Sequence, residues 1–139
     1  MKSGLKELAA AAIKMRERAY APYSHFTVGA AVLASSGKVY AGANVENASY
    51  GATVCAERVA VFKAIAAGER RLSALALSGG KEGEAGSWCT PCGICRQVMR
   101  EFADPKTFRV ILVRSASMTR SRTLAELLPE SFGPENLSR

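Results

Sequence analysis

Hydrophobic positions change their spacing several times along the chain, and each change predicts a different element. Near the N-terminus apolar side chains recur every three or four residues, which predicts a helix that begins near Ser3 and ends near Arg18. Two apolar stretches, 26–34 and 38–45, then lie on either side of a Ser-Ser-Gly turn. This arrangement predicts a β-hairpin.

The second half of the chain alternates helical and strand patterns. The elements predicted there are a helix over 54–67, a strand over 72–77, a helix over 92–102, a strand over 108–113 and a short helix over 123–128. The stretch 108–113 is continuously apolar, as in a buried strand of a parallel sheet. A hairpin followed by alternating helices and strands predicts an α/β fold, in which helices cover a mixed sheet within one domain spanning 1–139.

Composition excludes several classes of protein. No apolar run approaches the roughly 20 residues of a membrane span, and the N-terminus lacks the continuous apolar core of a signal peptide. We therefore expect a cytoplasmic protein with no membrane partner. The net charge is +7, but the basic residues are dispersed and aromatic residues do not alternate with them. Specific nucleic-acid binding is not expected.

Three of the four cysteines fall into two short motifs, Cys55-Ala56-Glu57 and Pro91-Cys92-Gly93-Ile94-Cys95. Three thiolates form an incomplete tetrahedral zinc shell, and catalytic zinc sites keep one position open, whereas structural sites are closed by four protein ligands. Both motifs lie at predicted helix starts, where the helix dipole favours a thiolate. The sequence therefore predicts one zinc ion per chain, bound off the two helix ends by Cys55, Cys92 and Cys95.

Cys89 and His25 are the alternative ligands. Cys89 would close the shell and make the protein a structural zinc module, but it lies before Pro91, outside the helix that orients the other two cysteines. His25 is the only histidine and is far in sequence from the cysteines. We expect neither residue to bind the metal.

Zinc with three thiolates carries a net charge of about −1, which opposes ionisation of a bound water unless positive groups offset it. Arg58 and Arg96 each follow a ligand motif directly. We expect at least one of them to donate hydrogen bonds to the thiolates from outside the ligand shell.

The pairing of Cys-Ala-Glu with Pro-Cys-x-x-Cys resembles the zinc-dependent nucleobase deaminases. The resemblance implies that Glu57 is not a ligand. It would instead take a proton from the metal-activated water, donate to the ring nitrogen and protonate the departing ammonia.

Further segments narrow the resemblance to the small homotetrameric cytidine deaminases, over almost the whole chain. These segments are Ser24-His25-Phe26-Thr27-Val28-Gly29-Ala30-Ala31, Asn44-Val45-Glu46-Asn47 and Glu126-Leu127-Leu128-Pro129. The family fold is a three-layer α/β/α domain with a mixed five-stranded sheet and an N-terminal β-hairpin. The resemblance implies that Asn44 and Glu46 bind ribose hydroxyls, Phe26 packs at the nucleoside and Ala56 offers backbone groups to the pyrimidine. It also implies that Phe132 reaches into a neighbouring subunit's site.

The implied activity is hydrolytic deamination of cytidine and 2'-deoxycytidine at C4 to uridine and 2'-deoxyuridine, with release of ammonia, in pyrimidine salvage. Related alternatives fit less well. A polynucleotide cytosine deaminase needs an open groove and basic loops for which this chain has little room. A blasticidin-type deaminase would not be expected to carry the Phe26 and Asn44–Glu46 segments, and a structural zinc module leaves Glu57 unexplained.

Overall fold

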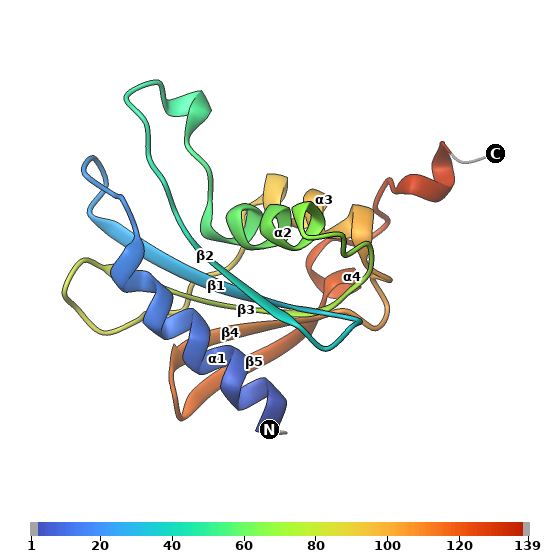
Figure 1. Ribbon diagram of the computed structural model, residues 1–139, viewed down its shortest axis with the longest axis horizontal. Coiled ribbons are helices and arrows are strands. Elements are labelled where there is room, and N and C mark those ends of the chain that lie inside the picture. The colour runs from blue at the N-terminus through green and yellow to red at the C-terminus, as the bar shows by residue number, and fades with distance from the viewer. Residues whose placement is uncertain (1–2, 138–139) are drawn as a thin grey trace.

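A five-stranded mixed sheet lies between one helix on one face and two helices on the other, as the computed structural model of the chain shows (Figure 1). The structure describes residues 3–137. The strands are β1 (Phe26–Ala34), β2 (Val39–Ala43), β3 (Leu72–Lys81), β4 (Arg109–Ser115) and β5 (Met118–Thr123). The α-helices are α1 (Ser3–Met15), α2 (Ala56–Ala66), α3 (Gly93–Phe102) and α4 (Leu124–Leu127), and short 3-10 helices occur at Arg16–Arg18, Tyr50–Ala52 and Pro134–Asn136.

The strand order is β2-β1-β3-β4-β5. β1 is antiparallel to β2 and β3, β3 is parallel to β4, and β4 is antiparallel to β5. The predicted hairpin, the parallel placement of the 108–113 strand and the three-layer α/β/α architecture are confirmed. The hydrophobic pattern did not predict β5, and β3 runs four residues beyond the predicted end at Leu77, to Lys81.

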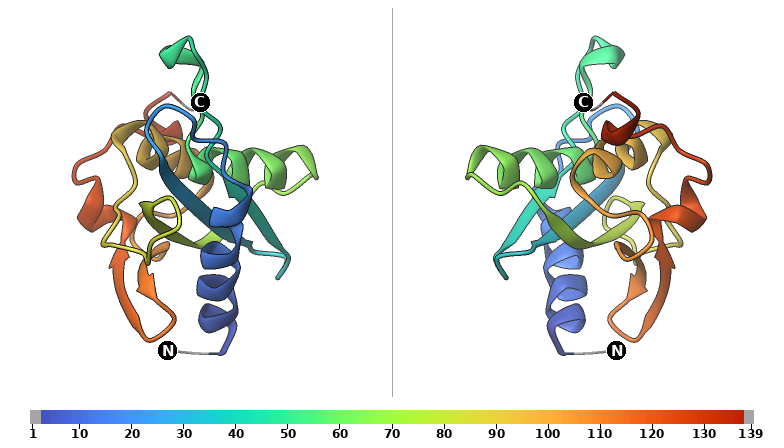
Figure 2. Two further views of the ribbon diagram at one scale, coloured as in Figure 1. Left: turned by 90° about the vertical axis from the view of Figure 1, so that its left-hand side faces the viewer. Right: turned by 90° about the vertical axis from the view of Figure 1, so that its right-hand side faces the viewer.

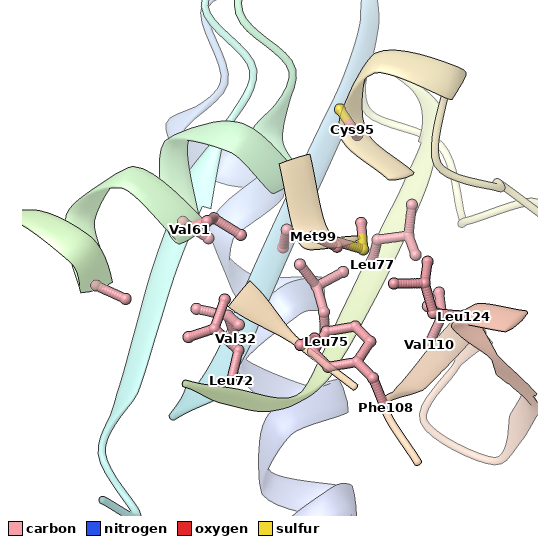
Figure 3. Packing of buried hydrophobic residues seen from close by; sticks show 14 of the residues in the cluster. Val32, Val61, Leu72, Leu75, Leu77, Cys95, Met99, Phe108, Val110 and Leu124 are labelled. Atoms are coloured by element: carbon pink, nitrogen blue, oxygen red, sulfur yellow. The ribbon is translucent and has the colours of Figure 1, made fainter. Parts of the chain in front are cut away.

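Alternate side chains of the three central strands enter two separate cores. On β1, Val32 faces the core beneath α2 and α3, whereas Ala31 faces the core beneath α1. On β4, Val110 and Ile111 divide in the same way. The core beneath α2 and α3 holds the larger side chains, including Leu75, Leu77, Met99 and Phe108 (Figure 3). This two-residue alternation is the packing that a strand buried on both faces requires.

Two glycines allow the helices to approach the sheet. A Cβ atom at Gly29 of β1 would overlap the backbone oxygen of Ala12 in α1, and one at Gly42 of β2 would lie 2.6 Å from the backbone nitrogen of Ala60 in α2. The helices can therefore pack this closely on the sheet only because both positions are glycine, which has no Cβ atom.

Figure 2 shows the segment between β2 and α2 extending beyond the body of the domain, on the side where α2 begins. Among the helices within residues 3–137, none is long and apolar enough to cross a membrane.

Candidate active site

Two helices that lie on the same face of the sheet begin with cysteines. Cys55 is the N-cap of α2 and Cys92 is the N-cap of α3, both with extended backbone angles. Cys95 lies in the first turn of α3 and is 1% exposed. All three cysteines thus lie at the N-terminal ends of these helices, and their sulfur atoms are within 4.8 Å of one another.

The distances within this group fit a tetrahedral metal. Cys55 Sγ lies 3.8 Å from Cys92 Sγ, and Cys92 Sγ lies 3.4 Å from Cys95 Sγ. Zinc–sulfur bonds of about 2.3 Å in a tetrahedron separate two sulfur atoms by about 3.8 Å. The three-cysteine group thus fits zinc with one coordination position left for another molecule.

Hydrogen bonds within the group favour a thiolate at Cys55. The Cys95 thiol, and after it the Nη2 of Arg58 at 3.4 Å, lower the pKa of Cys55 to about 5. The same pairing with Cys55, together with burial, raises the pKa of Cys95. A thiolate that already accepts hydrogen bonds is prepared to accept a cation, which then displaces the remaining thiol proton.

Glu57 lies two residues after Cys55, in the first turn of α2, and its side chain lines the cavity beside the sulfur atoms. The residue is 4% exposed, and burial raises the pKa of its carboxyl to about 7. A carboxyl with this pKa both accepts and releases a proton at neutral pH, which is the property that a general acid–base group needs.

A cavity of about 310 Å³ opens beside the cysteine group. It brings together residues of β1, the segment after β2, the start of α2 and the segment before α3. Its lining residues are Ser24, Phe26, Val28, Asn44, Glu46, Thr53, Cys55, Ala56, Glu57, Cys89, Thr90 and Cys92. The volume suits a small molecule with one ring system and a few polar groups.

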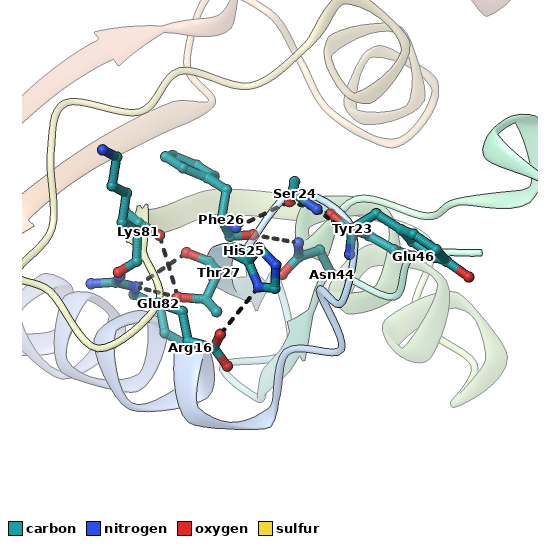
Figure 4. Close-up of polar contacts among 11 residues, drawn as sticks. Arg16, Tyr23, Ser24, His25, Phe26, Thr27, Asn44, Glu46, Lys81 and Glu82 are labelled. Carbon is teal, nitrogen blue, oxygen red and sulfur yellow. Dashed lines mark hydrogen bonds and ion pairs between the residues drawn. The ribbon is translucent and has the colours of Figure 1, made fainter. Parts of the chain in front are cut away.

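Asn44 spans the gap between its own segment and β1. Its Oδ1 accepts a hydrogen bond from the Val28 nitrogen at 2.9 Å, and its Nδ2 donates to the Phe26 carbonyl at 2.9 Å (Figure 4). One hydrogen of this amide is therefore used, and the second is available to a molecule in the cavity.

Glu46 is held by the loop that precedes Phe26. Its Oε1 accepts from the backbone nitrogens of Tyr23 and Ser24 at 3.0 and 3.1 Å, and its Oε2 accepts from the Ser24 hydroxyl (Figure 4). The Ser24 hydroxyl is the main cause that lowers the pKa of Glu46. A carboxylate has about four acceptor positions, so three donors leave one for a ligand.

The alternative ligands do not join the metal group. Cys89 lines the cavity, but its side chain rests on Gly79 beside the Phe26 ring, outside the three-sulfur cluster. Burial raises the pKa of Cys89 to about 11, so the thiol stays protonated at neutral pH. His25 Nδ1 instead lies 3.5 Å from the Glu82 carboxylate (Figure 4).

At least one of Arg58 and Arg96 is expected to donate to a thiolate, and Arg96 is not the one that does so. Its Nε donates to the Pro91 carbonyl at 3.0 Å and its Nη1 to the Leu127 carbonyl at 2.6 Å, and neither bond is to a thiolate. Arg58 is the arginine that contacts a cysteine sulfur. Arg96 acts one step further out, because it fixes the residue directly before Cys92.

Phe132 lies apart from the cavity of its own chain. The residue is 58% exposed and is not among the lining residues. Ser24, which was predicted only as part of the segment that contains Phe26, lines the cavity together with Thr53 and Thr90, whose residue types gave no signal of such a role. Only their proximity in sequence to Phe26, Cys55 and Cys92 could have indicated them.

Comparisons with known proteins agree with this geometry. A family model of the cytidine and deoxycytidylate deaminase zinc-binding region matches residues 2–111. The chain is 45% identical over 134 residues to a cytidine deaminase of Sporosarcina psychrophila, covering 96% of this chain and 95% of the relative. It is 46% identical over 127 residues to a cytidine deaminase of Halalkalibacterium halodurans, covering 91% of this chain and 92% of the relative.

Solved structures give the same result. The crystal structure of cytidine deaminase from Burkholderia pseudomallei matches with a TM-score of 0.82 and 46% identity, covering 95% of this chain and 100% of that one. The cytidine deaminase from Mycobacterium tuberculosis matches with a TM-score of 0.79 and 39% identity, covering 95% of this chain and 99% of that one.

Proposed function

The chain belongs to the cytidine and deoxycytidylate deaminase family and is a zinc-dependent cytidine deaminase, and from this premise we propose that Glu57 moves the protons of the reaction. The observation that carries the proposal is the near-complete burial of Glu57 directly beside the three-cysteine group. We propose that Cys55, Cys92 and Cys95 hold the zinc, as their sulfur positions allow.

When bound, zinc supplies a Lewis acid that lowers the pKa of a water molecule in its open position. Glu57 would accept one proton from that water and pass it to ring nitrogen N3, then take the second proton from the oxygen that has bonded to C4 and pass it to the departing amino group. A C4–O bond forms and the C4–N bond breaks, so the products are the uridine nucleoside and ammonia. One carboxyl can serve all these transfers because burial raises its pKa toward neutrality, where it both accepts and releases a proton.

Asn44 and Glu46 select a nucleoside over a free base. Each keeps one hydrogen-bonding position free beside the cavity after its contacts within the protein are counted. A donor and an acceptor of this kind pair with two adjacent sugar hydroxyls, while Phe26 and the backbone of Ala56 line the cavity beside the base. A free base would leave these polar groups unpaired, which strongly disfavours it.

The test is ammonia release from cytidine, 2'-deoxycytidine, cytosine and single-stranded DNA by the zinc-loaded protein. We expect turnover of both nucleosides, with little from cytosine or DNA. Glu57→Ala should lower kcat by about 10²- to 10⁴-fold while one zinc per chain remains. Turnover by Glu57→Ala close to that of the unmodified protein would refute the role of Glu57.

The protein is proposed to assemble as a homotetramer in which Phe132 completes a neighbour's site. Phe132 is exposed and outside its own cavity, and Phe62 on the outer side of α2 is 49% exposed. A second copy of the chain would cover these two exposed aromatic side chains. Sedimentation analysis should therefore show a homotetramer.

Mixed assemblies test whether Phe132 acts in the neighbouring site. A Phe132→Ala chain retains Glu57, and a Glu57→Ala chain retains Phe132. If the ring acts between subunits, co-assembly of these two chains creates sites that have both groups and regain the KM of the unmodified enzyme. A KM that stays at the value of Phe132→Ala alone would show that the ring does not act in trans.

We further propose that residues 1–139 act as one cytoplasmic domain in pyrimidine salvage. The four cysteines are free thiols, which persist in a reducing compartment. Cell fractionation should recover the activity with the cytoplasmic proteins; recovery in an oxidising compartment would contradict this placement.

A further inference from the structure

Three residues of α3 hold the chain segment that follows α4. Gln97 Nε2 donates to the Phe132 carbonyl at 2.9 Å, and Arg100 Nε donates to the Ser131 hydroxyl at 2.8 Å. Arg96 Nη1 donates to the carbonyl of Leu127, the last residue of α4, from which this segment continues. Figure 2 shows this C-terminal segment running past α3. The segment is therefore bound along the length of one helix.

Arg100 is the centre of this attachment. Although charged, the residue is only 8% exposed, and its Nη2 forms an ion pair with the Glu135 carboxylate. Its guanidinium also lies directly against Gly133, where an added Cβ would overlap the guanidinium carbon. A buried arginine that donates hydrogen bonds to two partners holds them more firmly than an exposed arginine–carboxylate pair holds its members.

Gly133 is held from its other side as well. Its nitrogen donates to Asn136 Oδ1 at 2.8 Å, and its carbonyl accepts from the Asn136 nitrogen at 3.0 Å. The chain is thus held at Ser131 through its side chain, and at Phe132 and Gly133 through the backbone. The Phe132 side chain nevertheless remains 58% exposed, so the contacts hold the backbone and leave the ring free.

We propose that Gln97, Arg100 and Gly133 are positioning residues that hold the Phe132 ring in the orientation in which it enters a neighbouring subunit's nucleoside cavity. This inference rests on the proposed role of Phe132 between subunits. A ring fixed before binding loses less conformational entropy when it stacks on a base, and this raises substrate affinity. Because α3 also carries Cys95 and begins at Cys92, one helix orients both a metal site and the ring given to the next site.

Gly133→Ala tests the proposal most directly, because the added methyl group displaces the segment from Arg100. We expect KM for cytidine to rise about tenfold, as loss of an aromatic–base contact would cause, with kcat within about twofold and one zinc per chain. Gln97→Met is a second variant on an exposed side chain, and it removes only the hydrogen bond to Phe132. Gly4→Ala is the matched control, since a Cβ there has no neighbour within 4 Å.

A double-mutant cycle separates a positioning role from a general structural one. In Phe132→Ala, adding Gly133→Ala or Gln97→Met should cause no further rise in KM, because the ring that they position is gone. If the two effects on KM multiply, or if Gly133→Ala and Gln97→Met leave KM unchanged while Phe132→Ala raises it, the positioning proposal is wrong. If Phe132→Ala itself leaves KM unchanged, the fault lies with the proposed role of Phe132 in the function.

Discussion

Arg58 Nη2 lies 3.4 Å from Cys55 Sγ, one helical turn along α2 from the cysteine that caps it. This contact places a permanent positive charge beside the metal group. The negative charge of three thiolates is larger than the positive charge of a divalent ion, so the group as a whole is negative. The Nε of the same guanidinium is buried and has no hydrogen-bond partner within the described residues. Burying a guanidinium nitrogen without a hydrogen-bond partner costs free energy, and an ionised or metal-bound sulfur beside the charge offsets that cost.

Arg58→Gln should weaken zinc binding by about 10- to 100-fold, because groups that contact metal ligands contribute affinity of that size. The measurement is competition for zinc with a chelator of known affinity. Arg70→Gln is the control, since Arg70 binds only backbone carbonyls near the other end of α2. Equal zinc affinity in the two variants would show that the contact with Cys55 has no part in holding the metal.

Cys89→Ser should retain one zinc per chain. The Cys89 side chain lies against Gly79 and outside the three-cysteine group, so it is not placed as a ligand. Cys92→Ser, which removes a sulfur from the three-cysteine group, should lose most of its zinc. The measurement is the zinc content of both purified variants. Loss of metal from Cys89→Ser would show that Cys89 is a fourth ligand.

His25 has a φ of 57°, in the left-handed region that residues with a Cβ rarely adopt. This backbone turns the chain between Ser24, which binds Glu46, and Phe26, which lines the cavity. His25→Gly should retain stability and activity, whereas His25→Val should lower the free energy of unfolding by about 1–3 kcal/mol. Denaturant titration provides the measurement.

The ion pair of His25 with Glu82 is the other explanation for such an effect. Both side chains are about two-thirds exposed, at 68% and 66%, and exposed pairs contribute little. Glu82→Gln should therefore leave stability nearly unchanged. If it destabilised the protein as much as His25→Val, the ion pair and not the backbone would be the cause.

Glu69 should make part of the stability dependent on pH. The Ser36 hydroxyl, and after it the Tyr40 hydroxyl, donate to its carboxylate at 2.7 and 2.8 Å and lower its pKa from the ordinary value of 4.5. A lowered folded-state pKa means that this stabilisation is complete above the unfolded-state pKa and disappears as pH falls through the folded-state pKa. The difference in Tm between the unmodified protein and Glu69→Gln should be largest near neutral pH and shrink in acid; a constant difference would exclude this origin.

Much of the fold could be predicted because apolar spacing and helix signals agreed. Gly68, with a φ of 102°, ends α2 where the sequence predicts, and Thr123 caps α4 through a hydrogen bond from the Glu126 nitrogen. β5 gave no pattern because its side chains are mostly exposed and it forms by pairing with β4. The end of β3 was missed because Gly79 and Gly80 favour a turn when read locally, whereas in the fold their missing side chains make room for Cys89 and Arg16.

The candidate site divides in the same manner. Cys55 and Cys92 were predicted at helix starts because short-range signals decide where a helix begins, and both are N-caps. Arg58 and Arg96 occupy equivalent places in their motifs, yet only Arg58 contacts a thiolate. Arg96 is turned away from the thiolates by its hydrogen bond to the Leu127 carbonyl. The position of that carbonyl depends on the tertiary structure, so the sequence near Arg96 could not predict it.

Gly29→Ala should lower the free energy of unfolding much more than Gly4→Ala does. The added Cβ would overlap the Ala12 oxygen and lie 2.7 Å from the Arg16 nitrogen, both backbone atoms of the segment that packs on β1. Backbone cannot rotate away as a flexible side chain can, so α1 must shift as a body, and overpacking of this kind costs about 1–3 kcal/mol or more. Gly4→Ala, in the same helix but with open space around it, should be neutral or slightly stabilising, because alanine favours a helix over glycine by about 1 kcal/mol. Denaturant titration of the zinc-loaded variants compares the two, and equal free energies of unfolding would mean that α1 does not rest on Gly29 as the structure shows.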